Sequence, residues 1–446
     1  MTDETAKLAH YALEELARCG ADASDVLIET SHSLSASCRL GAPELIERSE
    51  SHDIGLRAII GQRQAFVSAA GLRSQRAIAD LAARAVAMAQ RAPPDPWCGL
   101  CEAEALAKEF PSLELYDDST TDSASLQARA LELEAMALAE PEIANSEGAS
   151  AGWGESTLAL ATSHGFFGRY KSSHWYLSCV VLAARGGAQE RDYAGHQVRF
   201  AADLEPMDAL AKRAAARARA RLGAKKPPSQ NVPVLYDKRV APSLVRHLAS
   251  AINGQAIARG TSFLKDALGE QVFADGIEIV DEPHRPRGLG SALFDAEGAA
   301  MADLALVQNG QLQHWLLDSA SARQLQRPNT ARAARAIGGA PHPGSSNLYL
   351  KPGRQSPDEL RRSLKKGFLV TELIGMGVNI LTGDYSRGAV GHWIENGELA
   401  WPVSEVTLAG NLRDMFRHLV PANDLEFRAS IAAPSILVEN MTLAGR

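Results

Sequence analysis

One predicted helix carries a histidine where metal chemistry has to be considered. Pro242 suits the first turn of a helix that runs to about Ile252, and His247 lies within it. A metallopeptidase helix places two histidines one turn apart with a glutamate between them, so that both imidazoles bind one ion and the carboxylate handles a water. From Leu244 to Phe263 there is no second histidine and no acidic residue. The pattern therefore predicts no metal site and no catalytic residue in this segment.

A cysteine pair has the spacing of a metal or redox site. Cys98 and Cys101 are separated by two residues. They lie in a proline-rich stretch and not at the start of a helix, and no second cysteine pair or nearby histidine completes a set of ligands. We therefore interpret them as incidental surface thiols, and the sequence assigns them no role.

Two patterns in the C-terminal third match catalytic motifs only in part. Ser386 precedes His392 by six residues, but the Gly-x-Ser-x-Gly elbow of a serine hydrolase is absent, so turn capping by Asp384 and Ser386 is favoured. The glycines between residues 375 and 391 lack the Gly-Lys-Ser/Thr that completes a phosphate-binding loop. Turn and bulge glycines of a β-rich domain are the better interpretation.

Basic residues gather between residues 206 and 226. The seven are Lys212, Arg213, Arg217, Arg219, Arg221, Lys225 and Lys226, and only Asp208 opposes them within that stretch. Basic side chains near a helix C-terminus complement the negative end of its dipole. We predict a solvated face, with an acidic partner surface or nucleic acid as the alternatives.

A hairpin is the most distinctive pattern of the chain. Asn396 and Gly397 supply the two positive-φ residues of a type I′ turn, and apolar and polar residues alternate on both sides. Residues 381–388, just before it, predict a glycine-punctuated loop that enters the hairpin.

Composition restricts the class of protein. The chain has 446 residues and a net charge of −7, with 46% hydrophobic and 22% charged residues, which predicts two or three ordinary domains. A mildly acidic chain is an unfavourable nucleic-acid binder. The sequence has no apolar run long enough to span a membrane and no apolar signal core near its N-terminus. Five cysteines favour reduced thiols and a cytoplasmic location.

The elements that position these residues predict an α+β chain of three units. Residues 1–91 predict an antiparallel sheet covered by helices at 4–19 and 74–91, with strands at 26–39, 44–48, 54–60 and 64–69. Residues 92–111 predict a linker, and residues 112–228 a central α+β domain with helices near 122–140 and 206–222. Residues 229–446 predict a β-rich domain that opens with a strand at 232–236 and ends with strands at 427–431 and 435–442.

Several fragments, in their shared order, resemble the TldD/PmbA family. Residues 47–57 resemble its N-terminal domain, and 85–89 with 92–96 resemble its helix and linker. Residues 257–263, 347–350 and 381–386 resemble the TldE, or PmbA, half in particular. The family contains the paired subunits of a metal-dependent peptidase complex, of which only one carries the metal. An older label for the family is modulator of DNA gyrase.

The resemblance implies that this chain is the metal-free subunit. In the TldD half, a His-Glu-x-x-x-His motif lies upstream of a Gly-Thr-Ser similar to residues 260–262. Counting back from that triplet places the motif on Val245, Arg246 and Ser250, none of which can do the work of the motif. The TldD half also uses a cysteine near its C-terminus, whereas the last cysteine here is Cys179. The divalent metal is therefore expected in the partner and no cofactor in this chain.

The resemblance also implies a cytosolic complex with a TldD-like metallopeptidase subunit, which hydrolyses unfolded or extended peptides, including modified-peptide precursors. This chain would close the chamber around the partner's site, and an extended peptide would pair with a sheet edge. We expect Thr382, Gly383, Asp384, Tyr385 and Ser386 to lie at the peptide path or the subunit boundary.

Two other classes of function stay open at this point. A homodimeric peptide-binding or adaptor protein would fold stably without any TldD-like partner and bind peptides without turnover. A stand-alone peptidase with an unrecognised site would hydrolyse peptides by itself.

Overall fold

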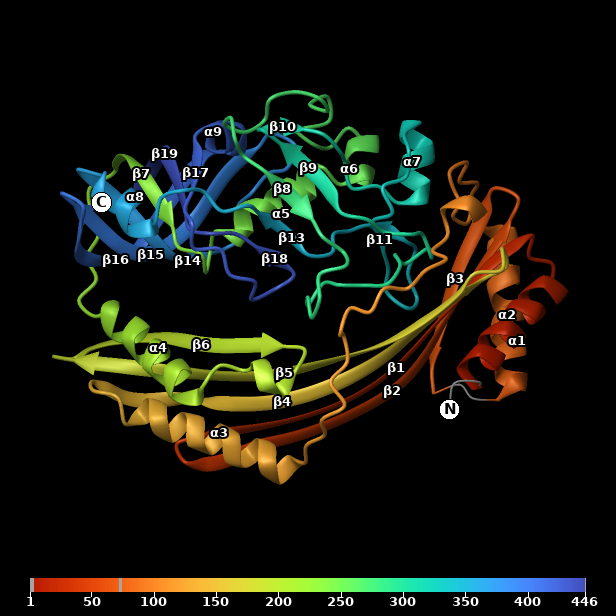
Figure 1. Ribbon diagram of the computed structural model, residues 1–446, viewed down its shortest axis with the longest axis horizontal. Coiled ribbons are helices and arrows are strands. Elements are labelled where there is room, and N and C mark those ends of the chain that lie inside the picture. The colour runs from red at the N-terminus through yellow and green to blue at the C-terminus, as the bar shows by residue number, and fades with distance from the viewer. Residues whose placement is uncertain (1–3, 72–73, 446) are drawn as a thin grey trace.

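The computed structural model describes residues 4–71 and 74–445 and has two bodies. A long curved sheet with helices on its outer side forms the first, and a β-rich domain built by the second half of the chain forms the other (Figure 1). The α+β prediction, with an antiparallel sheet first and a β-rich domain last, is confirmed.

The first sheet has six antiparallel strands in the order β3-β2-β1-β4-β5-β6. They are β1 (Ala23–Arg39), β2 (Ala42–Ile60), β3 (Arg63–Ala70), β4 (Ile143–Thr162), β5 (Phe167–Arg185) and β6 (Ala188–Val198). The two strands predicted at 44–48 and 54–60 are wrong as separate elements, since β2 runs through both. Because β1 pairs with β4, the N-terminal and central sequence units share one sheet.

Two pairs of helices cover this sheet at its two ends (Figure 1). They are α1 (Glu4–Arg18) with α2 (Gln75–Arg91), and α3 (Ser123–Leu138) with α4 (Met207–Ala220). Ser74 caps α2 and Asp122 caps α3, each by accepting a hydrogen bond from a backbone N–H of the first turn. The 20 residues of β4 span roughly 65 Å at about 3.3 Å per residue, which is long enough for two separate cores.

A closed barrel forms the centre of the C-terminal domain. Its sheet has the order β16-β15-β14-β7-β19-β17, and a further pairing of β16 with β19 closes it. The strands are β7 (Gln230–Tyr236), β14 (Lys366–Ile374), β15 (Asp384–Glu395), β16 (Glu398–Asn411), β17 (Leu419–Pro421) and β19 (Ile436–Ala444). Asn396 and Gly397 have φ values of 49° and 78°, so the predicted β15–β16 hairpin turn is confirmed.

Smaller elements surround the barrel. A five-stranded sheet contains β10 (Gln311–Leu312), β9 (Leu304–Gln308), β8 (Ile279–Asp281), β13 (Leu348–Leu350) and β18 (Ile431–Ala432), and β11 (Ala333–Ala334) pairs with β12 (His342–Pro343). The helices are α5 (Pro242–Ala251), α6 (Gly254–Ala258), α7 (Ser319–Leu325), α8 (Pro357–Arg362) and α9 (Leu412–Arg417). Earlier in the chain, 3-10 turns lie at Ala103–Ala105, between α2 and α3, and at Ala201–Asp203, between β6 and α4. The strand predicted at 427–431 is wrong except for its last residue, whereas the final strand is present as β19.

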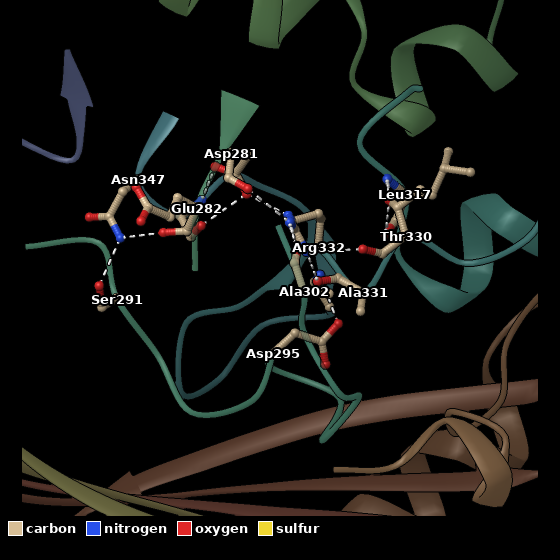
Figure 2. Close-up of polar contacts among 12 residues, drawn as sticks. Asp281, Glu282, Ser291, Asp295, Ala302, Leu317, Thr330, Ala331, Arg332 and Asn347 are labelled. Atoms are coloured by element: carbon tan, nitrogen blue, oxygen red, sulfur yellow. Dashed lines mark hydrogen bonds and ion pairs between the residues drawn. The ribbon is translucent and has the colours of Figure 1, made fainter. Parts of the chain in front are cut away.

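A buried ion pair joins the loops of this domain (Figure 2). Arg332 pairs with Asp281 at the end of β8, and both side chains are almost fully buried. Arg332 also donates hydrogen bonds to the carbonyls of Thr330 and Ala302, and Asp281 accepts one from the Ser346 hydroxyl. Because every charged group here has a partner, the pair fixes three loop segments against the five-stranded sheet.

Candidate functional site

A cleft of about 520 Å³ lies over helix α5, and its lining includes Arg246 and Ser250, two of the three residues that the metallopeptidase register singled out. Its lining comes from α5 and the residues just before it, from the end of β14 and the segment that follows, from Arg387 of β15 and from Tyr193 of β6. The volume is in the range of small-ligand sites, roughly 300 to 1,000 Å³.

Helix α5 divides its residues between the core and the cleft. Leu244, Val245 and Leu248 are buried in the core of the domain. Arg246 and Ser250 are exposed and line the cleft. Of the three positions that align with the metal-binding motif, one is therefore a core residue and the other two carry no metal ligand.

His247 is a neutral imidazole at neutral pH. Burial, followed by the positive charges of Arg387 and Arg246, lowers the pKa of His247 to about 4. Its ring meets the Tyr385 ring edge to face, with 6.1 Å between the centroids. Within the described residues, its buried Nε2 atom has no hydrogen-bond partner.

Three arginines and one glutamate are the fully charged residues that line the cleft. Arg239 is 2.7 Å from Asp192 of β6, and Glu372 pairs with Arg221, which lies at the C-terminal end of α4. Arg246 and Arg387 have no acidic partner in the part of the chain that the structure describes. The cleft is therefore cationic.

These residues do not fit a catalytic metal. Among residues 4–71 and 74–445, no group of three or more His, Cys, Asp or Glu side chains could hold an ion. His247 is the sole candidate ligand on α5, and the two arginines beside it would repel a cation.

The predicted residues 382–386 lie at the start of the barrel hairpin. The expected loop is wrong beyond residue 383, because β15 begins at Asp384. The Thr382 hydroxyl donates to the Asp384 carboxylate at 2.6 Å, and Asn411 of β16 also donates to that carboxylate at 3.2 Å. Gly383 has φ 85°, and a Cβ there would lie 2.9 Å from the Asn411 side chain. The backbone N–H groups of this turn are capped by other side chains, since Leu381 donates to the Asn379 side chain and Asp384 to the Thr382 hydroxyl.

Tyr385 and Ser386 belong to the strand itself. Tyr385 is 1% exposed and packs in the barrel core, while Ser386 is exposed and pairs with Ala409 through the backbone. Ser386 and His392 are six positions apart in one strand, roughly 20 Å at about 3.3 Å per residue, so they cannot form a catalytic pair. His392 instead contacts the Ala220 carbonyl at 2.9 Å.

Sequence reasoning missed an exposed apolar group next to these residues. Ile374, Met376 and Leu381 are 55%, 90% and 55% exposed, and they flank the turn between β14 and β15. Their signal in the sequence was three large apolar residues within a glycine-punctuated segment. Large exposed apolar side chains that cluster often mark an interaction surface.

Both remaining candidate groups differ from expectation. Cys101 is 2% exposed, so its interpretation as a surface thiol is wrong, and burial raises its pKa to about 11. The basic stretch is not simply a solvated face, since five of its seven side chains lie in ion pairs, which are Lys212–Asp208, Arg213–Glu205, Arg219–Glu140, Lys226–Glu405 and the contacts of Arg221 with Glu190, Asp192 and Glu372.

The whole length of the chain matches known proteins. Family models of the PmbA/TldA metallopeptidases match residues 24–89 as domain 1, 116–222 as the central domain and 229–445 as the C-terminal domain. Metalloprotease PmbA of Escherichia coli O157:H7 is 35% identical over 97% of this chain and 94% of its own length. A PmbA homologue of Haemophilus influenzae is 36% identical over 99% and 96%.

Solved structures have the same fold. A crystal structure from Bacteroides thetaiotaomicron, described as a modulator of DNA gyrase, has a TM-score of 0.91 with 28% identity and covers 100% of this chain and 99% of its own. TldE from Thermococcus kodakarensis has a TM-score of 0.88 with 18% identity, covering 99% and 100%. A TldD homologue of Haemophilus influenzae is 28% identical over only 53% of this chain. The predicted resemblance is confirmed, and the chain belongs to the PmbA/TldD family, on its PmbA, or TldE, side.

Proposed function

We propose that this chain is the metal-free subunit of a cytosolic complex with a TldD-like metallopeptidase, which degrades unfolded peptides or processes modified-peptide precursors. The observation that carries the proposal is helix α5. At the positions of the metal-binding motif it has Val245, Arg246 and Ser250, and the cleft beside it is cationic. A divalent metal would then belong to the partner.

Free sheet edges support a role in peptide binding. β3 and β6 are the outer strands of the six-stranded sheet, so each has one edge without a neighbouring strand among the described residues. An extended peptide can add to such an edge through main-chain hydrogen bonds, and such binding tolerates many sequences. Most of the backbone of a folded protein is already paired, whereas an unfolded chain can pair along any segment, which agrees with selectivity for unfolded chains.

The exposed apolar residues support a subunit boundary near residues 382–386. Ile374, Met376 and Leu381 lie beside the turn that contains Thr382 and Gly383. We propose that this end of the barrel faces the TldD-like partner, where burial of each side chain would stabilise the complex by about 1 to 3 kcal/mol.

Co-purification with the partner tests this proposal. The tagged chain is expressed with the TldD-like subunit of the same organism. The amount of partner that co-purifies is measured, and so is the peptidase activity of the recovered complex on an unfolded peptide. We expect M376E/L381E to weaken pairing by tenfold or more, since each charge would be buried in an apolar contact, at a cost of about 1.4 kcal/mol per factor of ten. L399E is the matched control, because Leu399 is 46% exposed next to the turn at the other end of the same hairpin.

Three results would contradict the proposal. Recovery of the native chain alone, as a self-associated species that binds peptides, would establish the homodimeric adaptor instead. Hydrolysis by the purified chain without a partner would establish a stand-alone peptidase. Equal losses of pairing in M376E/L381E and L399E would remove the proposed boundary.

A further inference from the structure

We propose that the cleft between α5 and β15 binds a carboxylate group of an extended peptide, held between Arg246 and Arg387. The inference rests on the proposed function for the nature of the ligand, a peptide. The cationic cleft itself is a property of this chain alone.

The two arginines reach the cleft from different elements. Arg246 projects from the exposed side of α5, and Arg387 comes from the fourth residue of β15. Both arginines line the same cleft as His247, and burial together with their positive charges lowers the pKa of that imidazole. A pair of arginines from two elements that meet at one cavity can grip an anion from two sides.

The acidic residues nearby do not neutralise these charges. Glu372, the only acid that lines the cleft among residues 4–71 and 74–445, pairs with Arg221, and Asp192 of β6 is 2.7 Å from Arg239. Arg246 and Arg387 stay without an acidic partner among the described residues. The two positive charges repel each other. A bound anion would be attracted by both and would offset this repulsion.

Unsatisfied polar atoms point to a ligand rather than to a solvated surface. The Nε of Arg387 and the Nε2 of His247 are buried, and neither has a hydrogen-bond partner in the described chain. Buried polar groups normally have one, so each such atom requires an explanation. A carboxylate in the cleft would accept a hydrogen bond from the Arg387 guanidinium, and a second from His247 in the tautomer that carries its proton on Nε2.

The remaining walls suit a peptide. Met376, Val378 and Ile380 also line the cleft and provide an apolar surface for a side chain. The cavity of about 520 Å³ can hold one or two residues but no folded domain. A planar guanidinium matches a carboxylate by two parallel hydrogen bonds, which favours this group over a simple halide.

Calorimetric titration of the purified chain tests the inference with three unlabelled probes. The first is an acetylated peptide of Ala, Gly and Ser residues with a free C-terminal carboxylate. The second is the same peptide with an amidated C-terminus, and the third is the amidated peptide with one internal glutamate. We expect a peptide with a carboxylate to bind about tenfold more tightly than the plain amide.

Variants assign the preference to the cleft. R246Q/R387Q is expected to abolish the preference for peptides with a carboxylate, and R246Q alone is expected to reduce it. R246Q changes an exposed position and leaves the core intact. R84Q is the matched control, because Arg84 is exposed on α2 of the other body. If only the peptide with a free C-terminus binds more tightly than the plain amide, the ligand group is the terminal carboxylate. If the peptide with an internal glutamate binds equally well, the cleft accepts any peptide carboxylate.

The inference is overturned if all three peptides bind equally or not at all, or if the preference survives in R246Q/R387Q. Co-purification of the TldD-like partner with the same double variant separates the two proposals. A retained partner without any carboxylate preference overturns only the cleft, whereas a native chain that never recruits the partner overturns the proposed function.

Discussion

Two buried carboxyl groups show how strongly position acts on a single residue. Asp295 and Glu297 lie on the loop before β9 and are buried, and desolvation raises their pKa values to about 6 and about 7. Asp295 accepts hydrogen bonds from the backbone N–H groups of Glu297, Ala299 and Ala333, and Glu297 accepts one from that of Ser319. Nothing in the local sequence distinguishes these acids from exposed ones.

The raised pKa of Glu297 predicts a loss of stability as the pH rises. The folded state binds the proton more tightly than the unfolded chain, so this contribution is fully present below pH 4.5 and is lost on the way to about pH 7. E297Q keeps a neutral acceptor for the Ser319 N–H. We expect it to be more stable than the native chain at pH 8, by an amount on the order of 1 kcal/mol per pKa unit.

Thermal melting between pH 5 and pH 8 measures this effect. The melting temperature of the native chain should fall more over that range than that of E297Q. E359Q is the control, because Glu359 is an exposed capping residue with a lowered pKa and does not titrate in this window. Parallel curves for the native chain and E297Q would contradict the prediction.

At the scale of single elements, local sequence was informative. The helices α1 to α5 begin and end within about two residues of their predicted bounds, because apolar spacing and capping residues act over one or two turns. The β15–β16 turn followed from Asn396 and Gly397 alone. The full length of β2 could not be predicted from the local sequence, because its outer half is exposed and lacks an apolar face. Only its pairing with β1 keeps that half extended.

The hairpin turn predicts the effect of adding a methyl group. Gly397 has φ 78°, and a Cβ there would lie 2.8 Å from the Cα of Arg362 in α8. G397A therefore combines backbone strain with a clash against the backbone, and we expect a loss of about 2 to 4 kcal/mol in unfolding free energy by urea titration. G186A is the matched control, since Gly186 has φ 58° at a hairpin turn in open space, with about 1 kcal/mol expected. Equal losses would show that the α8 contact is unimportant.

At the scale of the whole molecule, ion pairs connect the two bodies. Glu205, just before α4, pairs with Arg213 at 2.5 Å and with Arg428 of the C-terminal domain at 2.6 Å. Arg335 pairs with Asp25 of β1, and Arg221 pairs with Glu372 of β14. Within the basic stretch 206–226, Arg219, Arg221 and Lys226 pair with acids in distant segments, which are Glu140, Glu372 and Glu405. The sequence alone could not indicate these three partners.

Glu205 predicts a weaker junction when its charge is removed. Hydrogen bonds from Arg428 lower the pKa of Glu205 well below its ordinary value, so its contribution is present above about pH 4.5 and lost in acid. E205Q should cost about 1 kcal/mol, since the pair is partly exposed to solvent. Hydrogen exchange should accelerate in β6 and around residue 428 on both sides of the junction. E142Q is the control, because Glu142 pairs with Arg185 inside the first body and not across the junction. If E142Q accelerated hydrogen exchange in β6 and around residue 428 as E205Q does, the prediction would be contradicted.

The sequence by itself determined the short-range structure, the family and the lack of a metal-binding motif on α5. These depend on residue types at fixed spacings, which act within a few turns or can be compared position by position. Only the tertiary structure decided that β1 pairs with β4, that Tyr385 lies in the core and that Arg246 meets Arg387 in a cleft. The strand pairing and the cleft bring together residues more than 100 positions apart, and the burial of Tyr385 depends on which face of its strand the closed barrel covers. No local pattern encodes such contacts.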